Sequence, residues 1–238
     1  MTRALDLEAW EWMLSGSRMF RGQLSTFNPE AIAAPSRLPG WSRAHVIAHV
    51  AANAEALRRL THWASSGEER LMYASREARD AEIESGSALP IKELLEWLHT
   101  SDRQLIEELE ALSPESWSAL VITAQGREIP ALDILWMRSR ETWIHGVDLD
   151  GSATFNAMPV AFLKRLVFEA CSKFDNPNHP TVHVVATDHI EQWAIRGGNE
   201  VVEVRGSLPD LATWLTGRGS DRLATPSGEP VPSLGPWL

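Results

Sequence analysis

Residues 129–149 read IPALDILWMRSRETWIHGVDL, and this stretch decides the fold of the first part of the chain. It is largely apolar and long enough for a helix, and it places Glu141 and His145 four residues apart. Residues at this spacing lie on one face of a helix. A carboxylate is almost never fully buried unless it is paired or bound to a metal. The stretch therefore predicts either a buried ion pair or a metal site.

A second apolar stretch carries two histidines at the same spacing. Ser42 is suited to cap the start of a helix that runs through residues 43–65. His45 and His49 both lie in it, and His49 shares the apolar stripe that contains Val46. We expect at most one of these histidines to be a ligand. His49 is the inward candidate, and His45 is expected at the surface near the cap.

Together, His49, Glu141 and His145 form a set of two imidazoles and one carboxylate. With an open fourth position this set suits catalytic zinc, and the same ligand types suit iron(II). Asp148 lies one turn beyond His145 and is able to orient an imidazole as an acceptor. Its position at the helix end favours exposure to solvent instead, which is the interpretation we prefer from sequence.

A purely structural alternative stays open at this point. Glu141 would form a buried ion pair with Arg138 or Arg140, and His145 would be an ordinary core histidine. The spacing of one carboxylate and one histidine is a weak pattern and does not decide between the two interpretations.

The periodicity of apolar residues organises the chain into two parts. We expect an α+β protein, with an antiparallel four-helix bundle in residues 1–150 and a small α+β domain in residues 151–238. The bundle helices are predicted at residues 5–26, 42–65, 90–109 and 131–148, with residues 68–87 forming an irregular crossing. In the second domain, residues 192–205 predict a β-hairpin that turns at 197–199, followed by a helix over residues 211–215 that leads to Arg218.

Composition excludes several classes of function. The net charge is −10 from 22 basic and 32 acidic residues, without a basic run, which argues against nucleic acid and anionic membranes as partners. No apolar run has the length of a membrane span and no signal-like start is present, so we expect a cytoplasmic protein. The single cysteine, Cys171, excludes an internal disulfide and a cysteine-rich zinc site. Cys171 lies in an apolar helix and is expected to be inert core.

Three stretches resemble a known family. They are residues 40–51 (GWSRAHVIAHVA), 136–145 (WMRSRETWIH) and 217–221 (GRGSD). They are similar to the mycothiol-dependent maleylpyruvate isomerase family, which belongs to the DinB-like superfamily of metal-binding bundles. The similarity extends from about residue 38 to the end of the chain.

The resemblance implies a DinB-like four-helix bundle followed by a small α+β domain. The family's metal ligands match His49, Glu141 and His145, and its essential arginine matches Arg218, in preference to Arg222. The implied cofactors are zinc, or another divalent metal, and mycothiol. The implied partners are a small dicarboxylate substrate and a low-molecular-weight thiol, and the protein is expected to be a monomer.

The activity implied by the resemblance is cis–trans isomerisation of maleylpyruvate to fumarylpyruvate in gentisate-type degradation of aromatic compounds. The double bond has to become single for a moment, and reversible addition of a zinc-bound mycothiol thiolate would achieve this. Arg218 would hold a substrate carboxylate and stabilise the enolate. Three alternatives remain: a mycothiol S-transferase for other electrophiles, a non-enzymatic zinc-binding regulatory bundle, and a bundle without metal.

Overall fold

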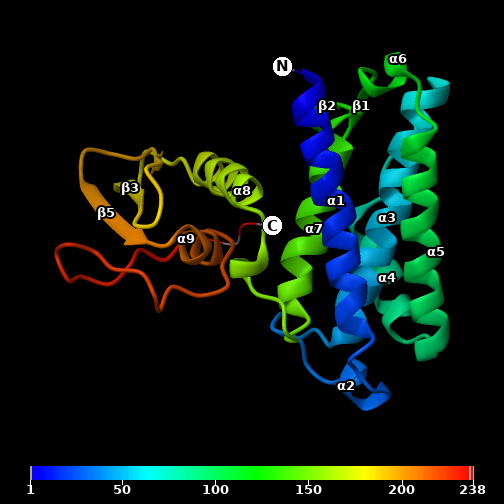
Figure 1. The fold of residues 1–238 in the computed structure, drawn as a ribbon, viewed down its shortest axis with the longest axis horizontal. Helices are drawn as coiled ribbons and strands as arrows, with labels where there is room; N and C mark the ends of the chain where they lie inside the picture. Colours follow the sequence, from blue (N-terminus) through cyan, green and yellow to red (C-terminus); the bar gives the residue numbers. More distant parts are fainter. Residues whose placement is uncertain (1, 236, 238) are drawn as a thin grey trace. The chain divides into compact units, whose positions relative to one another are not determined.

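The chain forms two compact units, residues Met1–Ala153 and Thr154–Leu238 (Figure 1). The computed structural model describes residues 2–235 and residue 237, with side chains from Leu7 onward in the first helix. Within these residues no helix is both long and apolar enough to cross a lipid bilayer. The fold class predicted from the sequence, a helical bundle followed by a small α+β domain, is confirmed.

Four long helices build the first unit: α1 (Thr2–Leu24), α3 (Arg43–Ser66), α5 (Ile91–Glu110) and α7 (Asp133–Asp148). Helix α1 packs along α7, α3 packs along α5, and α3 also contacts α7 (Figure 1). Each helix turns an apolar stripe inward, as amphipathic helices of a bundle do. The contact between α3 and α7 brings the two histidine-bearing helices predicted from sequence side by side.

Shorter elements connect the long helices. These are α2 (Pro29–Ala33), α4 (Arg76–Ser87), α6 (Pro114–Trp117), and the antiparallel strands β1 (Leu120–Ile122) and β2 (Glu128–Pro130). Pro130 is the last residue of β2, and α7 begins at Asp133, two residues later than the start predicted from the sequence.

Helix α3 has well-defined ends and an almost wholly buried body. Ser42 caps its start by accepting a hydrogen bond from the backbone N–H of His45, and the side chain of His45 accepts from the backbone N–H of Ser42 in return. Gly67 ends the helix in the left-handed conformation at φ 75°, where glycine has no steric penalty. Its inward face is rich in alanine, which lets neighbouring helices approach closely.

A buried polar network crosses the centre of the bundle. Arg138 of α7 donates to the carbonyl oxygen of Val50 at 2.7 Å, to Asn53 Oδ1 at 3.0 Å and to Asp102 Oδ1 at 3.0 Å. Ser17 of α1 donates to the same carboxylate oxygen at 3.0 Å. The network joins all four long helices, and it ties α7 to α3 at the residue that follows His49.

The structure corrects the prediction for residues 68–87. Residues Arg76–Ser87 form α4, which Ser75 caps by accepting from the backbone N–H of Ala78. Most of its side chains are charged or exposed, which hid the helical pattern; the buried ones are Ile83 and Gly86. A Cβ at Gly86 would collide with Trp97 and press against Ala48 of α3, so glycine permits the close approach of α4 to the bundle.

The second unit packs two helices on a three-stranded sheet. Its elements are η1 (Phe155–Ala157), α8 (Val160–Lys173), β3 (Thr181–Ala186), β4 (Gln192–Ile195), β5 (Val201–Gly206) and α9 (Leu208–Leu215). Helix α8 contacts β4 and α9, and α9 contacts β3 and β5.

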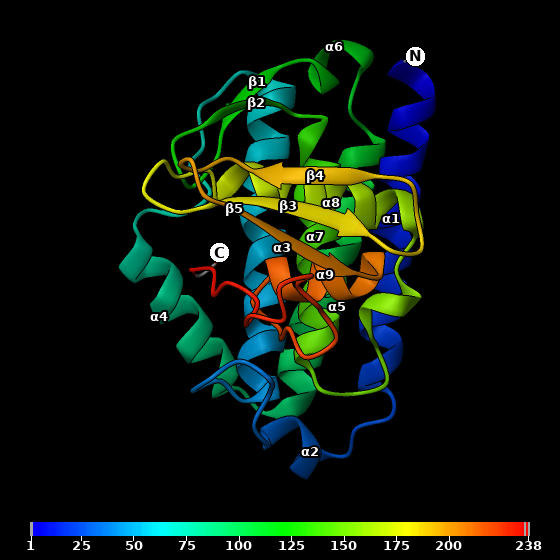
Figure 2. The ribbon, with the colours of Figure 1, turned by 90° about the vertical axis from the view of Figure 1, so that its left-hand side faces the viewer.

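The predicted β-hairpin in the second unit is wrong. The strand order is β4-β3-β5, with β3 antiparallel to β4 and parallel to β5 (Figure 2). The connection from β4 to β5 passes over the start of β3, where Gly198 N–H donates to the carbonyl oxygen of His179 at 2.7 Å. A Cβ at Gly197 would collide with the backbone of His179 and Pro180. The glycines therefore permit a close backbone crossing instead of a hairpin turn.

Candidate metal centre

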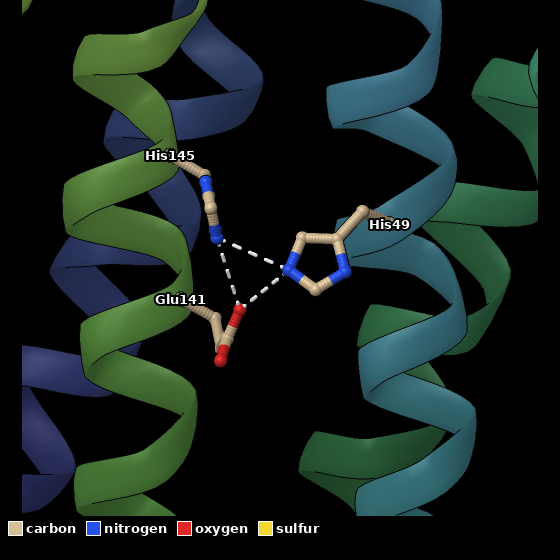
Figure 3. A group of neighbouring side chains, drawn as sticks. All are labelled: His49, Glu141 and His145. Atoms are coloured by element: carbon tan, nitrogen blue, oxygen red, sulfur yellow. Dashed lines mark hydrogen bonds and ion pairs between the residues drawn. The ribbon is translucent and has the colours of Figure 1, made fainter. Parts of the chain in front are cut away.

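Three side chains from two helices meet between α3 and α7 (Figure 3). His49 Nε2 lies 2.8 Å from Glu141 Oε2 and 3.1 Å from His145 Nε2. The third side of the triangle, from His145 Nε2 to Glu141 Oε2, measures 3.3 Å. These are the three residues that the sequence predicts as metal ligands, and the fold brings all three together.

The spacing of these donor atoms fits a divalent metal ion. Four ligands placed tetrahedrally at the bond lengths usual for zinc are about 3.3 Å apart. The three donor atoms have separations of 2.8, 3.1 and 3.3 Å, so small outward movements of the side chains would accommodate an ion. Two imidazoles and a carboxylate also leave a fourth position for a thiol, a water molecule or a substrate. Among the described residues, no other group of three histidine, cysteine or acidic side chains has this arrangement.

Asp148 is buried and holds His145 in place, which corrects the expectation that it faces solvent. Its side chain is 0% exposed, and its Oδ2 lies 2.9 Å from His145 Nδ1. The carboxylate accepts a hydrogen bond from Nδ1–H, which orients the ring so that Nε2 faces His49 and Glu141. A carboxylate on the far nitrogen of a ligand histidine is the usual support of such a ligand.

The charges of the cluster suit a cation. Burial raises the pKa of Glu141, but hydrogen bonds from His145 and His49 outweigh burial and hold this pKa well below its usual value. Burial is the largest influence on His49 and lowers its pKa, against the hydrogen bond to Glu141. Burial also acts to lower the pKa of His145, but hydrogen bonds to Asp148 and Glu141 more than offset it and raise this pKa. At neutral pH the cluster therefore holds an ionised carboxylate and a neutral His49.

His45 takes no part in the cluster, in agreement with its predicted place near the helix cap. Its Nδ1 lies 2.7 Å from Ser42 Oγ, and its Nε2 lies 3.3 Å from Glu84 Oε2. The two histidines differ by one helical turn: His45 lies in the first turn of α3 and is held by the Ser42 cap, whereas His49 lies one turn further along, where α3 meets Glu141 and His145 of α7.

Arg138, one of the two arginines that the structural alternative pairs with Glu141, points into the core of the bundle. Its guanidinium binds Asp102, Asn53 and the backbone of Val50. The partners of Glu141 that lie within hydrogen-bond distance are the two imidazoles.

Sequence reasoning missed a group of side chains around His49. The ring of Trp41 lies edge-on to His49 with 5.6 Å between ring centres. Arg79 Nη2 lies 3.3 Å from His49 Nδ1, and the guanidinium of Arg79 sits over the ring of Tyr73. The sequence signal that could have located Arg79 is Ser75, because it caps the start of the helix that carries Arg79.

Arg218 lies in the second unit, just beyond α9. Its backbone N–H donates to the carbonyl oxygen of Thr213 at 2.8 Å, and its guanidinium donates to the carbonyl oxygen of Thr216. The flanking Gly217 and Gly219 have φ of 78° and 130°, conformations that favour glycine. Arg218 is partly buried, whereas Arg222 is exposed and lies 4.0 Å from Asp210.

Cys171 is buried in α8, as predicted. Burial, with a contribution from the charge of Asp175, raises the pKa of its thiol to about 12. A thiol in this state is neither a ready nucleophile nor a metal ligand.

The bundle and its three converging donors define a helical-bundle protein with a site able to bind a divalent metal. The family model of the mycothiol maleylpyruvate isomerase N-terminal domain matches residues 14–150. The chain therefore belongs to the mycothiol-dependent maleylpyruvate isomerase family.

Solved structures agree with this assignment over the whole chain. The crystal structure of the mycothiol-dependent maleylpyruvate isomerase is 38% identical, with a TM-score of 0.93 over 98% of this chain and 97% of that one. The crystal structure of a variant of that enzyme, in which one histidine is replaced by alanine, matches with the same identity, coverage and TM-score. No curated protein matches the chain.

Proposed function

We propose that this protein isomerises maleylpyruvate to fumarylpyruvate in a mycothiol-dependent reaction, within gentisate-type degradation of aromatic compounds. The observation that carries the proposal is the meeting of His49, Glu141 and His145 in a chain that matches this family from end to end. The match over both units favours the isomerase over a transferase or a non-enzymatic bundle that shares only the helical domain.

The metal ligands in this proposal are His49, Glu141 and His145, and the metal is zinc or another divalent ion. When bound, such a metal lowers the pKa of a coordinated thiol and so makes a thiolate available at neutral pH. A divalent cation held by one carboxylate and two neutral imidazoles would keep a net positive charge, and this charge would attract an anionic partner. A protein of net charge −10 needs such a local positive centre to bind a dicarboxylate.

The side chains around the ligands keep the site in one arrangement. Asp148 holds His145 through Nδ1 at 2.9 Å and thereby fixes the nitrogen that faces the metal. The contact of Arg138 with the carbonyl oxygen of Val50 fixes the distance between the two ligand-bearing helices next to His49. Preorganised ligands of this kind need little rearrangement when the metal and the thiol bind.

Arg218 is proposed to bind a carboxylate of the substrate and to stabilise the negative charge of the enolate. Guanidinium is the group best suited to bidentate carboxylate recognition, and it is charged at every physiological pH. Support comes from its partly buried position between two glycines with positive φ. The more exposed Arg222 has a single ion-pair distance of 4.0 Å and is the less favoured candidate.

The test is an isomerase assay that follows maleylpyruvate with and without mycothiol, using native protein and protein treated with a chelator. Isomerisation that requires both mycothiol and metal is expected. Arg218→Ala should lose turnover while its metal content stays unchanged, and Arg222→Ala should retain turnover. Full activity in a metal-free preparation, or stable thiol conjugates in place of fumarylpyruvate, would contradict the proposal.

The remaining proposals concern the state of the protein in the cell. We infer that it acts in the cytoplasm, where a free thiol cofactor stays reduced, and that it acts as a monomer. Fractionation of cells and sedimentation of the purified protein test these two points. A stable dimer in sedimentation would contradict the second.

A further inference from the structure

Arg79 places a permanent positive charge beside the metal-ligand cluster. It lies in the first turn of α4, and its Nη2 is 3.3 Å from Nδ1 of His49. Its guanidinium carbon lies 6.0 Å from the centre of the Tyr73 ring, and its Nη1 is 2.9 Å from Asp80 Oδ1. The side chain is 31% exposed, so a small molecule at the cluster is able to reach it.

The ion pair between Arg79 and Asp80 does not explain why Arg79 lies beside His49. Asp80 is more than half exposed, and ion pairs between exposed side chains contribute little to stability. A guanidinium next to a ligand histidine also carries an electrostatic cost, because it repels a divalent cation at the cluster. The charge of Arg79 acts with the larger effect of burial to lower the pKa of His49. An anion lying between the guanidinium of Arg79 and the divalent cation would offset that cost.

Tyr73 holds the guanidinium beside the cluster. An arginine over an aromatic ring is stabilised by the cation–π interaction, which restricts where the charge lies. Burial, followed by the charge of Glu141, raises the pKa of the Tyr73 hydroxyl to about 12, so the hydroxyl stays protonated. The contacts with Asp80 and His49 are made by Nη1 and Nη2, and a guanidinium has five N–H donors in all.

We propose that Arg79, held by Tyr73, binds a carboxylate of the substrate beside the metal centre. This inference rests on the proposed function, since maleylpyruvate carries two carboxylates and Arg218 is proposed for only one of them. Arg79 then contributes to the selection of dicarboxylate substrates over electrophiles with a single negative charge.

The test compares Arg79→Gln with Arg76→Gln, a matched control in the same helix whose side chain is 88% exposed. Loss of one charge-assisted carboxylate contact should raise KM for maleylpyruvate by about tenfold to a hundredfold in Arg79→Gln. KM for mycothiol should not change, and zinc affinity should stay equal or rise, because a repelling charge has been removed. KM for maleylpyruvate in Arg79→Lys should lie between the values for Arg79→Gln and for the unsubstituted protein. Arg76→Gln should behave as the unsubstituted protein.

A binding measurement separates this inference from the proposed function. Calorimetric titration of the zinc-loaded protein with maleate needs no turnover, and Arg79→Gln should weaken maleate binding while Arg76→Gln does not. Absence of isomerase activity in the unsubstituted protein would refute the proposed function and leave the maleate comparison to decide the role of Arg79. Unchanged maleate binding and KM in Arg79→Gln, or a loss of zinc affinity, would overturn the inference and make Arg79 a structural support of His49.

Discussion

Replacing Asp148 by asparagine should weaken metal binding without unfolding the bundle. The buried carboxylate lies 2.9 Å from His145 Nδ1, and asparagine keeps its size while removing its charge. Replacement of a group that supports a metal ligand in this way usually costs tenfold to a hundredfold in metal affinity, which corresponds to about 1.4–2.7 kcal/mol. We expect a loss in this range for zinc at a pH where His145 is fully neutral.

The same substitution should move the pH dependence of zinc binding. A metal ion binds the neutral imidazole, so zinc affinity falls as the pH drops through the pKa of His145. Burial acts to lower this pKa, but hydrogen bonds to Asp148 and Glu141 raise it above the ordinary value of 6.5, so the fall in affinity begins above pH 6.5. Without the Asp148 carboxylate the pKa of His145 decreases, and the midpoint shifts to lower pH.

The assay is competition for zinc between the protein and a chelator of known affinity, measured from pH 5 to pH 9. Circular dichroism of each variant checks that the helices are retained. Asp150→Asn is the control, since Asp150 is an exposed carboxylate two residues further along that pairs with Arg37. The reasoning would be refuted if Asp148→Asn kept both the affinity at high pH and the midpoint of the unsubstituted protein.

Three further substitutions test the core and the source of the thiol. Arg138→Met leaves the buried Asp102 without its closest cationic partner and should lower the free energy of unfolding in urea by about 3 kcal/mol. Gly16→Ala should lower it by about 1–3 kcal/mol, because a Cβ there would collide with the side chains of Thr142 and Trp143 and force α1 away from α7. Cys171→Ala should retain isomerase activity with mycothiol, because the buried thiol, whose pKa is about 12, supplies no thiolate.

Each of these substitutions has a control or a contradicting result. Arg103→Gln removes an exposed ion pair and should cost less than about 1 kcal/mol; an equal loss in Arg103→Gln would argue against the special role of Arg138. In the same helix as Gly16, a Cβ at Gly22 meets nothing within 4 Å, so Gly22→Ala should be neutral or stabilising. Loss of activity in a folded Cys171→Ala variant would contradict the need for an external thiol.

Sequence patterns predict the bundle and the helix faces that carry the candidate ligands, because these depend on local spacing; that the two helices face each other was implied by the family resemblance. The i to i+4 spacing of Glu141 and His145, and the place of His49 in an apolar stripe, are fixed once the helices form. Local patterns predict the side chain of Asp148 in solvent, because a helix end is usually exposed. Here the chain before α3 covers that end, and Arg37 N–H donates to the carbonyl oxygen of Asp148 at 2.9 Å. That contact joins residues far apart in sequence, which local patterns do not report.

The features that sequence reasoning missed also depend on distant contacts. Helix α4 has few buried side chains, so its charged sequence shows little apolar periodicity, and the approach of Arg79 to His49 follows only from packing against α3. In the second unit the glycines at 197–198 give a strong local turn signal. Pairing of both flanking strands with β3 overrides it, because strand partners are chosen by the whole sheet.

Metal content is the most direct test of the central claim that His49, Glu141 and His145 form one metal site. Elemental analysis of purified protein, after removal of loosely bound ions, would compare the unsubstituted chain with His49→Ala and His45→Ala. We predict one divalent ion per chain in the unsubstituted protein and in His45→Ala, and none in His49→Ala. A full complement of metal in a folded His49→Ala variant, or none in the unsubstituted protein, would contradict the claim.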